Sequence, residues 1–204
     1  MLASYPNADN ANCLSLGFRF GFCLNFNGPR RRVGYKNMTS ADQYKFELQE
    51  KIDKEVSLGR ILGPFLDLPI SNLRCNPIGL VPKKQGGWRM ITNLSYPPGS
   101  SVNDFIDPEI CSVNYSTFDD AIALIVSKGP GALLAKMDIS SAFRLLPVSP
   151  QDFCLLGFRH SGAYYIDKCL PMGCSLSCAL FEKFSKFCIG NCPVGLIYIQ
   201  LFII

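Results

Sequence analysis

The chain has 204 residues, of which 48% are hydrophobic and 18% are charged, and its formal net charge is +4. This length suits one packed domain, and the balance of apolar and charged residues argues against a wholly disordered chain. The small positive charge is compatible with a polyanionic partner but does not require one.

The sequence predicts an intracellular protein, cytoplasmic or nuclear, with no membrane partner. Residues 1–16 contain no basic segment followed by an apolar core, so we expect no secretory signal. The longest uncharged apolar stretch, residues 194–204, is shorter than the roughly 20 residues that a membrane span needs. The ten cysteines are expected to be reduced thiols, most of them buried.

Zinc is not expected. Two pairs of cysteines have the spacing Cys-x-x-x-Cys, but neither pair has a nearby histidine, so the signal for a zinc site is weak. These pairs are Cys174 with Cys178, and Cys188 with Cys192.

The first 60 residues predict an irregular segment followed by a helix. Residues 1–40 read as irregular, and the basic patch of Arg30, Arg31 and Arg32 follows Gly-Pro and therefore lies on a loop. A solvated turn and a contact with phosphate both fit this patch. Residues 40–59 predict a helix that Ser40 caps and a glycine ends.

A β-hairpin is predicted next. Its strands are Pro77–Pro82 and Trp88–Leu94, and the turn between them contains two glycines. The cations Lys83 and Lys84 precede the turn, and Arg89 follows it.

The second half of the chain predicts two helices and three strands. Residues 116–127 form a helix with Ser116 as its cap and Asp119-Asp120 in its first turn, where acidic residues are favoured. The predicted strands are Ala132–Ala135, which reads as buried, Cys154–Phe158 and Ala163–Ile166. His160 lies in the turn between the last two strands, and residues 175–188 read as helical.

Two features after residue 130 could carry chemistry. Asp138 follows a buried strand, and a carboxylate held there suits a hard cation, although it could also cap a helix. The loop Leu170–Ser175 contains Pro-Met-Gly and opens a helix, and its glycine allows close approach of backbone to a ligand. His160 is the only histidine, which argues against a Ser-His-Asp or Cys-His nucleophile.

In their order and spacing, three segments make the chain resemble reverse transcriptases, most closely those of DIRS-like retrotransposons. The segments are NPIGLVPKKQGGWRMITNLSYPPGSSVND, LLAKMDISSAFRLLPVSPQDFCLLGF and YYIDKCLPMGCSLSCALFEKF. The resemblance implies an α+β fold: a partial right-hand polymerase with fingers, an incomplete palm, an antiparallel sheet and flanking helices. It divides the chain into an N-terminal extension (1–58), fingers and partial palm (59–188) and an atypical apolar tail (189–204).

The resemblance also implies roles for single residues near the incoming nucleotide. Either Lys83 or Lys84, together with Arg89, matches the fingers hairpin that contacts the triphosphate. Asp138 matches the first catalytic aspartate, and Ile139 would offer its backbone carbonyl to the same metal.

Further residues match the parts of the site around the sugar and the base. Phe143 matches the aromatic gate beneath the sugar, which favours deoxynucleotides. The loop that lies along the nucleotide and template is matched by Pro171, Met172 and Gly173, although many relatives carry glutamine in place of Met172. Arg30, Arg31 and Arg32 are expected to contact nucleic acid.

The implied reaction is the transfer of a nucleotide from a deoxynucleoside triphosphate to the 3′-hydroxyl of a primer paired to an RNA or DNA template. It needs two Mg²⁺ ions about 3.5–4 Å apart, usually held by three carboxylates. After Leu170 the only acidic residue is Glu182, so the aromatic-x-Asp-Asp hairpin of the family is missing. We expect a truncated enzyme or an inactive nucleic-acid-binding remnant, and an unrelated α+β binding module is the third hypothesis.

Overall fold

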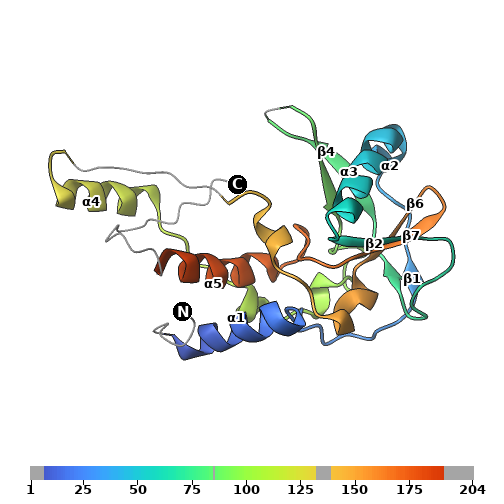
Figure 1. Cartoon of the computed structure of the whole chain (residues 1–204), viewed down its shortest axis with the longest axis horizontal. Helices are drawn as coiled ribbons and strands as arrows, with labels where there is room; N and C mark the ends of the chain where they lie inside the picture. Colours follow the sequence, from blue (N-terminus) through green and yellow to red (C-terminus); the bar gives the residue numbers. More distant parts are fainter. Residues whose placement is uncertain (1–6, 85, 132–138, 191–204) are drawn as a thin grey trace.

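The computed structural model describes residues 7–84, 86–131 and 139–190. Its strands form a five-stranded sheet in the order β1-β3-β6-β7-β2 and a separate hairpin of β4 and β5. Figure 1 shows the strands gathered at one end with α2 and α3, while α1, α5 and α4 extend toward the other end. The predicted mixed α+β class is confirmed.

In chain order, the elements are α1 (Ala8–Phe20), β1 (Val33–Gly34), α2 (Thr39–Gln43), α3 (Lys45–Ser57), β2 (Ile61–Phe65), β3 (Arg74–Cys75), β4 (Ile78–Pro82), β5 (Trp88–Thr92), η2 (Asn103–Phe105), η3 (Pro108–Cys111), α4 (Phe118–Lys128), η4 (Ala142–Leu145), η5 (Pro150–Leu155), β6 (Gly157–His160), β7 (Ala163–Asp167) and α5 (Ser177–Gly190).

The five-stranded sheet is mixed, whereas the sequence predicted an antiparallel one. The pairs β6–β7 and β7–β2 are antiparallel. The short pairs β1–β3 and β3–β6 are parallel. Chain segments far apart in sequence therefore meet side by side, which local patterns do not reveal.

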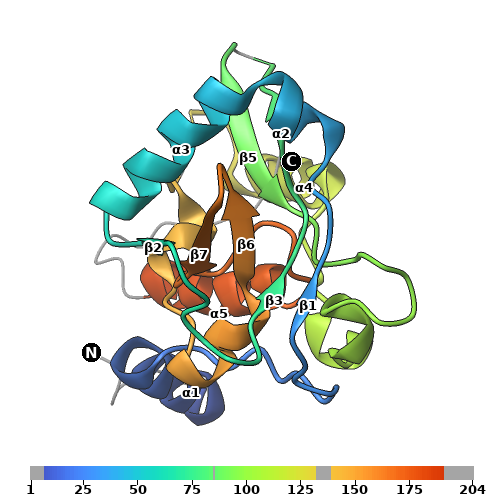
Figure 2. The same ribbon diagram turned by 90° about the vertical axis from the view of Figure 1, so that its right-hand side faces the viewer.

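Helix α3 packs on the sheet and on the hairpin, and Figure 2 shows it lying across this end of the molecule. Its buried residues Leu48 and Ile52 share one core with Phe158 of β6 and Leu80 of β4. The helix predicted for residues 40–59 is two helices, because the chain breaks at Tyr44.

Helix α1 corrects the prediction that residues 1–40 are irregular. The Asn7 side chain caps it by accepting a hydrogen bond from the backbone N–H of Asn10 at 2.8 Å. Phe18 packs edge-to-face on Phe184 of α5, with ring centroids 5.4 Å apart. The helix depends on a partner far along the chain, which explains why its own sequence gave little sign of it.

Helix α4 is capped one residue later than predicted. Thr117, and not Ser116, is the cap, and it forms a reciprocal capping box with Asp120. Asp119 and Asp120 do lie in the first turn of a helix, so this prediction is confirmed. The strand predicted over Ala132–Ala135 lies outside the described residues.

The segment before β7 differs from the prediction in two ways. The first two residues of the strand predicted over Cys154–Phe158 belong to the 3-10 helix η5, and β6 starts only at Gly157. His160 ends β6 and is buried, whereas the sequence placed it in the turn. Burial lowers the pKa of its imidazole, which favours the neutral form.

Asp152 connects the N-terminal segment to the rest of the molecule. Its buried carboxylate accepts a hydrogen bond from the backbone N–H of Leu24 at 2.7 Å. Nη2 of Arg30 lies 2.6 Å from the other carboxylate oxygen. The first 58 residues therefore share packing with the remainder, and the domain boundaries at 58 and 188 stay predictions.

None of the helices in the described ranges is both long and apolar enough to cross a membrane. All nine cysteines that the structure describes are free thiols, and four of them are buried: Cys75, Cys154, Cys169 and Cys174.

Asp152→Ala is expected to lower the free energy of unfolding by about 3 kcal/mol, because it leaves a buried N–H and a guanidinium without their acceptor. Urea unfolding followed by circular dichroism measures this loss. Asp107→Ala is the control, since that carboxylate also accepts a backbone hydrogen bond but in an exposed turn. Equal losses in the two variants would contradict the role of Asp152.

Candidate nucleotide site

The hairpin of β4 and β5 presents three cations to solvent. Its register pairs Pro82 with Trp88, and the N–H of Lys83 bonds to the carbonyl of Gly87 at 3.0 Å. Lys83, Lys84 and Arg89 are exposed, and within the described residues none of them has a carboxylate at ion-pair distance. Their charges are therefore available to an anion from outside the chain.

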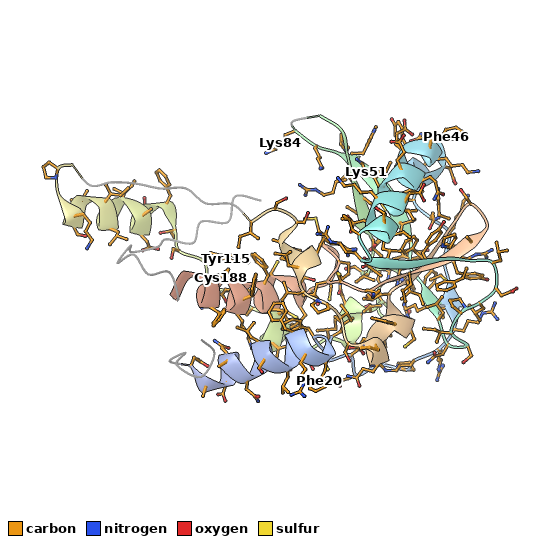
Figure 3. The ribbon with its side chains drawn as sticks, in the orientation of Figure 1. Phe20, Phe46, Lys51, Lys84, Tyr115 and Cys188 are labelled. Atoms are coloured by element: carbon orange, nitrogen blue, oxygen red, sulfur yellow. The ribbon has the colours of Figure 1, made fainter. Side chains whose placement is uncertain are left out.

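A pair of aromatic rings fixes the last strand pair before the turn of this hairpin. The Trp88 ring packs on the ring of Tyr44, with centroids 4.1 Å apart. Because Tyr44 lies between α2 and α3, the hairpin is attached to the helices while its tip projects away from them, as the position of Lys84 in Figure 3 shows.

The loop of Pro171, Met172 and Gly173 lies against the end of β5. The carbonyl of Gly173 accepts a hydrogen bond from Asn103 Nδ2 at 2.9 Å, and the carbonyl of Pro171 accepts one from Ser177 Oγ at 2.8 Å. A Cβ on Gly173 would collide with the carbonyl oxygen of Thr92. Glycine is therefore required here by close contact between two backbones.

A cavity of about 270 Å³ opens where this loop meets β5. Pro171 is buried, whereas Met172 is 50% exposed and contributes its side chain to the wall. The cavity is lined by Met38, Ile91, Thr92, Asn93, Leu94, Ser95, Met172 and Gly173. The structure thus brings the Pro-Met-Gly loop to the end of β5 that lies away from the turn, whereas Lys83, Lys84 and Arg89 do not line this cavity.

Phe143 and Ile139 occupy the segment that precedes β6. The Phe143 ring packs edge-to-face on Phe181 of α5, with centroids 5.6 Å apart, and Ile139 is partly buried against the same core. Asp138, the predicted metal ligand, lies outside the described residues. Within the described residues, no group of three or more His, Cys, Asp and Glu side chains could hold a metal ion.

The three arginines of the basic patch differ in their surroundings. Arg30 is bound to Asp152, and its guanidinium also lies 5.6 Å from the centre of the Phe26 ring. Arg31 and Arg32 are exposed and have no ion pair in the part of the chain that the structure describes. Of the three predicted contacts with nucleic acid, Arg31 and Arg32 are the two whose charge is free.

Sequence reasoning missed Arg144, which directly follows Phe143. Its Nη1 lies 2.7 Å from both carboxylate oxygens of Asp167, and its Nε lies 3.0 Å from Oε2 of Glu55. Burial alone would lower the pKa of Arg144, but these two carboxylates raise it, so the guanidinium stays charged. Burial raises the pKa of the Asp167 carboxyl, and Arg144 acts against that shift.

Tyr115 precedes α4, and its neighbours are Cys178 and Glu182 of α5. Burial raises the pKa of Tyr115 to about 12, and the neighbouring Cys178 and Glu182 of α5 add to the shift. The segment before α4 is therefore held against α5.

Comparison with known proteins gives relatives of one kind. The chain is 27% identical over 149 residues to the Pro-Pol polyprotein of feline foamy virus, a match that covers 73% of this chain and 12% of that protein. It is 28% identical over 116 residues to the transposon Tf2-7 polyprotein of Schizosaccharomyces pombe, covering 56% of this chain and 8% of the relative. No family model matches the chain.

Solved structures show the same relation at the level of the fold. The protease-reverse transcriptase of prototype foamy virus matches 84% of this chain and 20% of its own, with 21% identity and a TM-score of 0.53. A foamy viral protease-reverse transcriptase in complex with an RNA/DNA hybrid matches 98% of this chain and 27% of its own, with 18% identity and a TM-score of 0.56.

The fold of this chain therefore resembles the polymerase fold of a reverse transcriptase. By sequence the chain is related to retroviral and retrotransposon polyproteins, of which it spans about a tenth. The assignment to DIRS-like elements and the roles of the single site residues stay predictions.

Gly173→Ala is expected to lower the free energy of unfolding by about 2 kcal/mol, because the new methyl group overlaps the Thr92 carbonyl. Gly34→Ala is the matched control, since a Cβ there meets nothing within 4 Å. Urea unfolding of both variants measures the difference. A Gly173→Ala variant as stable as Gly34→Ala would show that the two backbones do not touch as described.

Proposed function

We propose that this chain is a reverse-transcriptase domain of a DIRS-like retrotransposon, comprising the fingers and part of the palm. Its proposed partners are a template-primer of RNA or DNA and deoxynucleoside triphosphates. The observation that carries the proposal is the meeting of the hairpin strand β5 with the loop of Met172 and Gly173, in a fold that resembles foamy virus reverse transcriptase.

In this proposal the chain's own residues bind and orient the nucleotide. Lys83 or Lys84, together with Arg89, offsets the charge of the triphosphate through charge-assisted hydrogen bonds. The Phe143 ring lies beneath the sugar and disfavours a 2′-hydroxyl by steric exclusion. Gly173 lets the loop backbone approach the nucleotide and template, and Met172 adds apolar contact.

The proposed reaction also needs Mg²⁺ ions held by carboxylates. Asp138 and the Ile139 carbonyl are the proposed ligands for Mg²⁺, which in this family would activate the primer hydroxyl and the α-phosphate. The described residues hold no metal-binding cluster, and residues 183–204 contain neither Asp nor Glu. The role that we assign to these 204 residues by themselves is therefore binding.

A second candidate follows from the same observation. A protein that keeps the free cations at positions 31, 32, 83, 84 and 89 but has a single metal-binding aspartate would bind nucleic acid without catalysis. The two candidates share their binding residues and differ only in turnover.

Nucleotide binding can be followed with Trp88, the only tryptophan, which lies on the hairpin. Titration with a deoxynucleoside triphosphate and Mg²⁺ is expected to change its fluorescence. Replacing Lys83, Lys84 and Arg89 together by Gln is expected to weaken binding at least about tenfold, because charge-assisted hydrogen bonds to the triphosphate are lost. Lys128→Gln, on the distant helix α4, is the control (Figure 1). Equal affinity in both variants would exclude the hairpin as the triphosphate site.

Primer extension separates the two candidates. With Mg²⁺, a primed template and all deoxynucleotides, we expect the 204-residue chain to synthesise no DNA, because one carboxylate cannot hold two metal ions. Measurable extension that disappears in Asp138→Ala would instead favour the polymerase. Synthesis that survives Asp138→Ala would exclude the mechanism proposed here.

RNA binding tests the basic loop. Fluorescence anisotropy with a labelled single-stranded RNA is expected to show affinity that falls as salt rises, because phosphate contacts release counterions. Replacing Arg31 and Arg32 by Gln should reduce the slope of log K against log salt by about 1.4, the value for two lost single-strand contacts. Arg30→Gln tests the third predicted contact and is expected to change stability more than the slope, because Arg30 binds Asp152. An unchanged slope in the double variant would contradict the assignment.

A further inference from the structure

Arg144 joins three parts of the molecule and directly follows Phe143, which the proposed function places beneath the sugar. Glu55 belongs to α3, and Asp167 ends β7. Nη1 of Arg144 also lies 3.3 Å from the carbonyl oxygen of Cys169, at the start of the chain that leads to the Pro-Met-Gly loop. Arg144 itself lies in η4, next to Phe143. One guanidinium thus contacts the helix, the strand end and the loop entrance.

The contacts of Arg144 are largely shielded from solvent, and its Nη2 lies 3.0 Å from Glu55 Oε2 without forming a hydrogen bond. Its side chain is 15% exposed, and those of Asp167 and Glu55 are 5% and 20% exposed. Asp167 Oδ1 also accepts the backbone N–H of Cys169 at 3.1 Å. The guanidinium is therefore held from two sides by carboxylates that are themselves fixed.

Backbone contacts already connect η4 to the loop entrance, but not to α3. The N–H of Leu170 bonds to the carbonyl of Leu146 at 3.0 Å, and the N–H of Leu146 bonds to the carbonyl of Phe143 at 3.1 Å. Among the described residues, the pair of Arg144 with Glu55 is the only ion pair between η4 and α3. Arg144 is therefore the charged link between η4 and α3, and it acts beside the packing of Phe143 on Phe181 and the backbone bond of Lys168 to Arg60.

We propose that Arg144 is a positioning residue for nucleotide selection. It does not touch the nucleotide; it fixes Phe143 and the loop that starts at Cys169 relative to α3, and thereby sets the discrimination between deoxy- and ribonucleotides. The inference rests on the proposed function for the role of Phe143. A lysine cannot replace the guanidinium, because its single ammonium lacks the planar set of donors that reaches both carboxylates at once.

The test compares Arg144→Lys with Arg60→Lys in the full chain. Arg60 lies 3.6 Å from the same Glu55 but has no ion pair with Asp167, so its variant keeps the charge and disturbs only the α3 end. Hydrogen–deuterium exchange is measured over residues 50–57, 142–146 and 168–174. The affinities for GTP and dGTP are measured through Trp88 fluorescence, and urea unfolding gives the global stability.

We expect Arg144→Lys to raise exchange in all three segments and to reduce the preference for dGTP over GTP about fivefold, which corresponds to one lost hydrogen bond. Arg60→Lys is expected to raise exchange near residue 55 alone and to leave the preference unchanged. Lower global stability with an unchanged preference would show a merely structural role and overturn the inference.

Two results separate this inference from the proposed function. If the unmodified chain binds no nucleotide, the proposed function is refuted, and the role in nucleotide selection falls with it. Hydrogen–deuterium exchange would still test whether Arg144 couples the three segments. That coupling requires exchange to rise in all three segments together in Arg144→Lys. Loosening confined to residues 142–146 would refute that coupling even if nucleotide binds.

Discussion

The buried pair of Arg144 and Asp167 is the contact on which the arrangement of this site depends. Nη1 lies 2.7 Å from both oxygens of Asp167 and Nε lies 3.0 Å from Glu55, so the two carboxylates together fix the orientation of the guanidinium. Such a pair adds little net stability, because removing both charges from water offsets much of their attraction, but removing one partner alone costs about 3–5 kcal/mol. The interaction therefore fixes the position of β7 relative to η4. Its net contribution to the free energy of unfolding is small by comparison. Glu55 extends this selection to α3.

Two hydrophobic cores surround this pair, and their packing explains why few polar contacts are enough to hold the site in place. One core joins α3 with β4, β6 and β7, and the other joins α1 and α5 with the chain around Leu146 and Leu156. The first carries the hairpin and the second carries Phe143 and the Pro-Met-Gly loop. Their relative position is set where the Arg144 cluster and the backbone contact of Gly173 with Thr92 connect them. A site built between two cores is sensitive to both connections, which are partly buried.

Sequence patterns predicted the parts of this fold that form locally. The hairpin needed only alternating apolar residues and a glycine turn, and the helix that carries Asp119 and Asp120 needed only its cap and first-turn acids. Helix α1 was missed because Leu16, Phe18 and Phe20 are exposed and hide its apolar periodicity. Arg144 was missed for another reason: its partners lie 23 and 89 residues away, and no local pattern marks such a triad. The site residues were predicted from the resemblance of motifs to a known family. The residues that hold them in place were found only from long-range packing in the structure.

The cations of this chain fall into two groups that net charge does not separate. Arg30 and Arg144 are neutralised by Asp152, Asp167 and Glu55, so they contribute structure and little external field. The cations at positions 31, 32, 83, 84 and 89 lack ion pairs in the described residues and can attract phosphate, so a formal charge of +4 understates the local potential at the hairpin and the basic loop. The proposed anion binding at the hairpin and the basic loop depends on these exposed groups. Transfer chemistry depends instead on carboxylates that hold cations against phosphate, a separate set of residues. Binding and catalysis therefore have independent physical requirements here, and a chain with this arrangement can meet the first without the second.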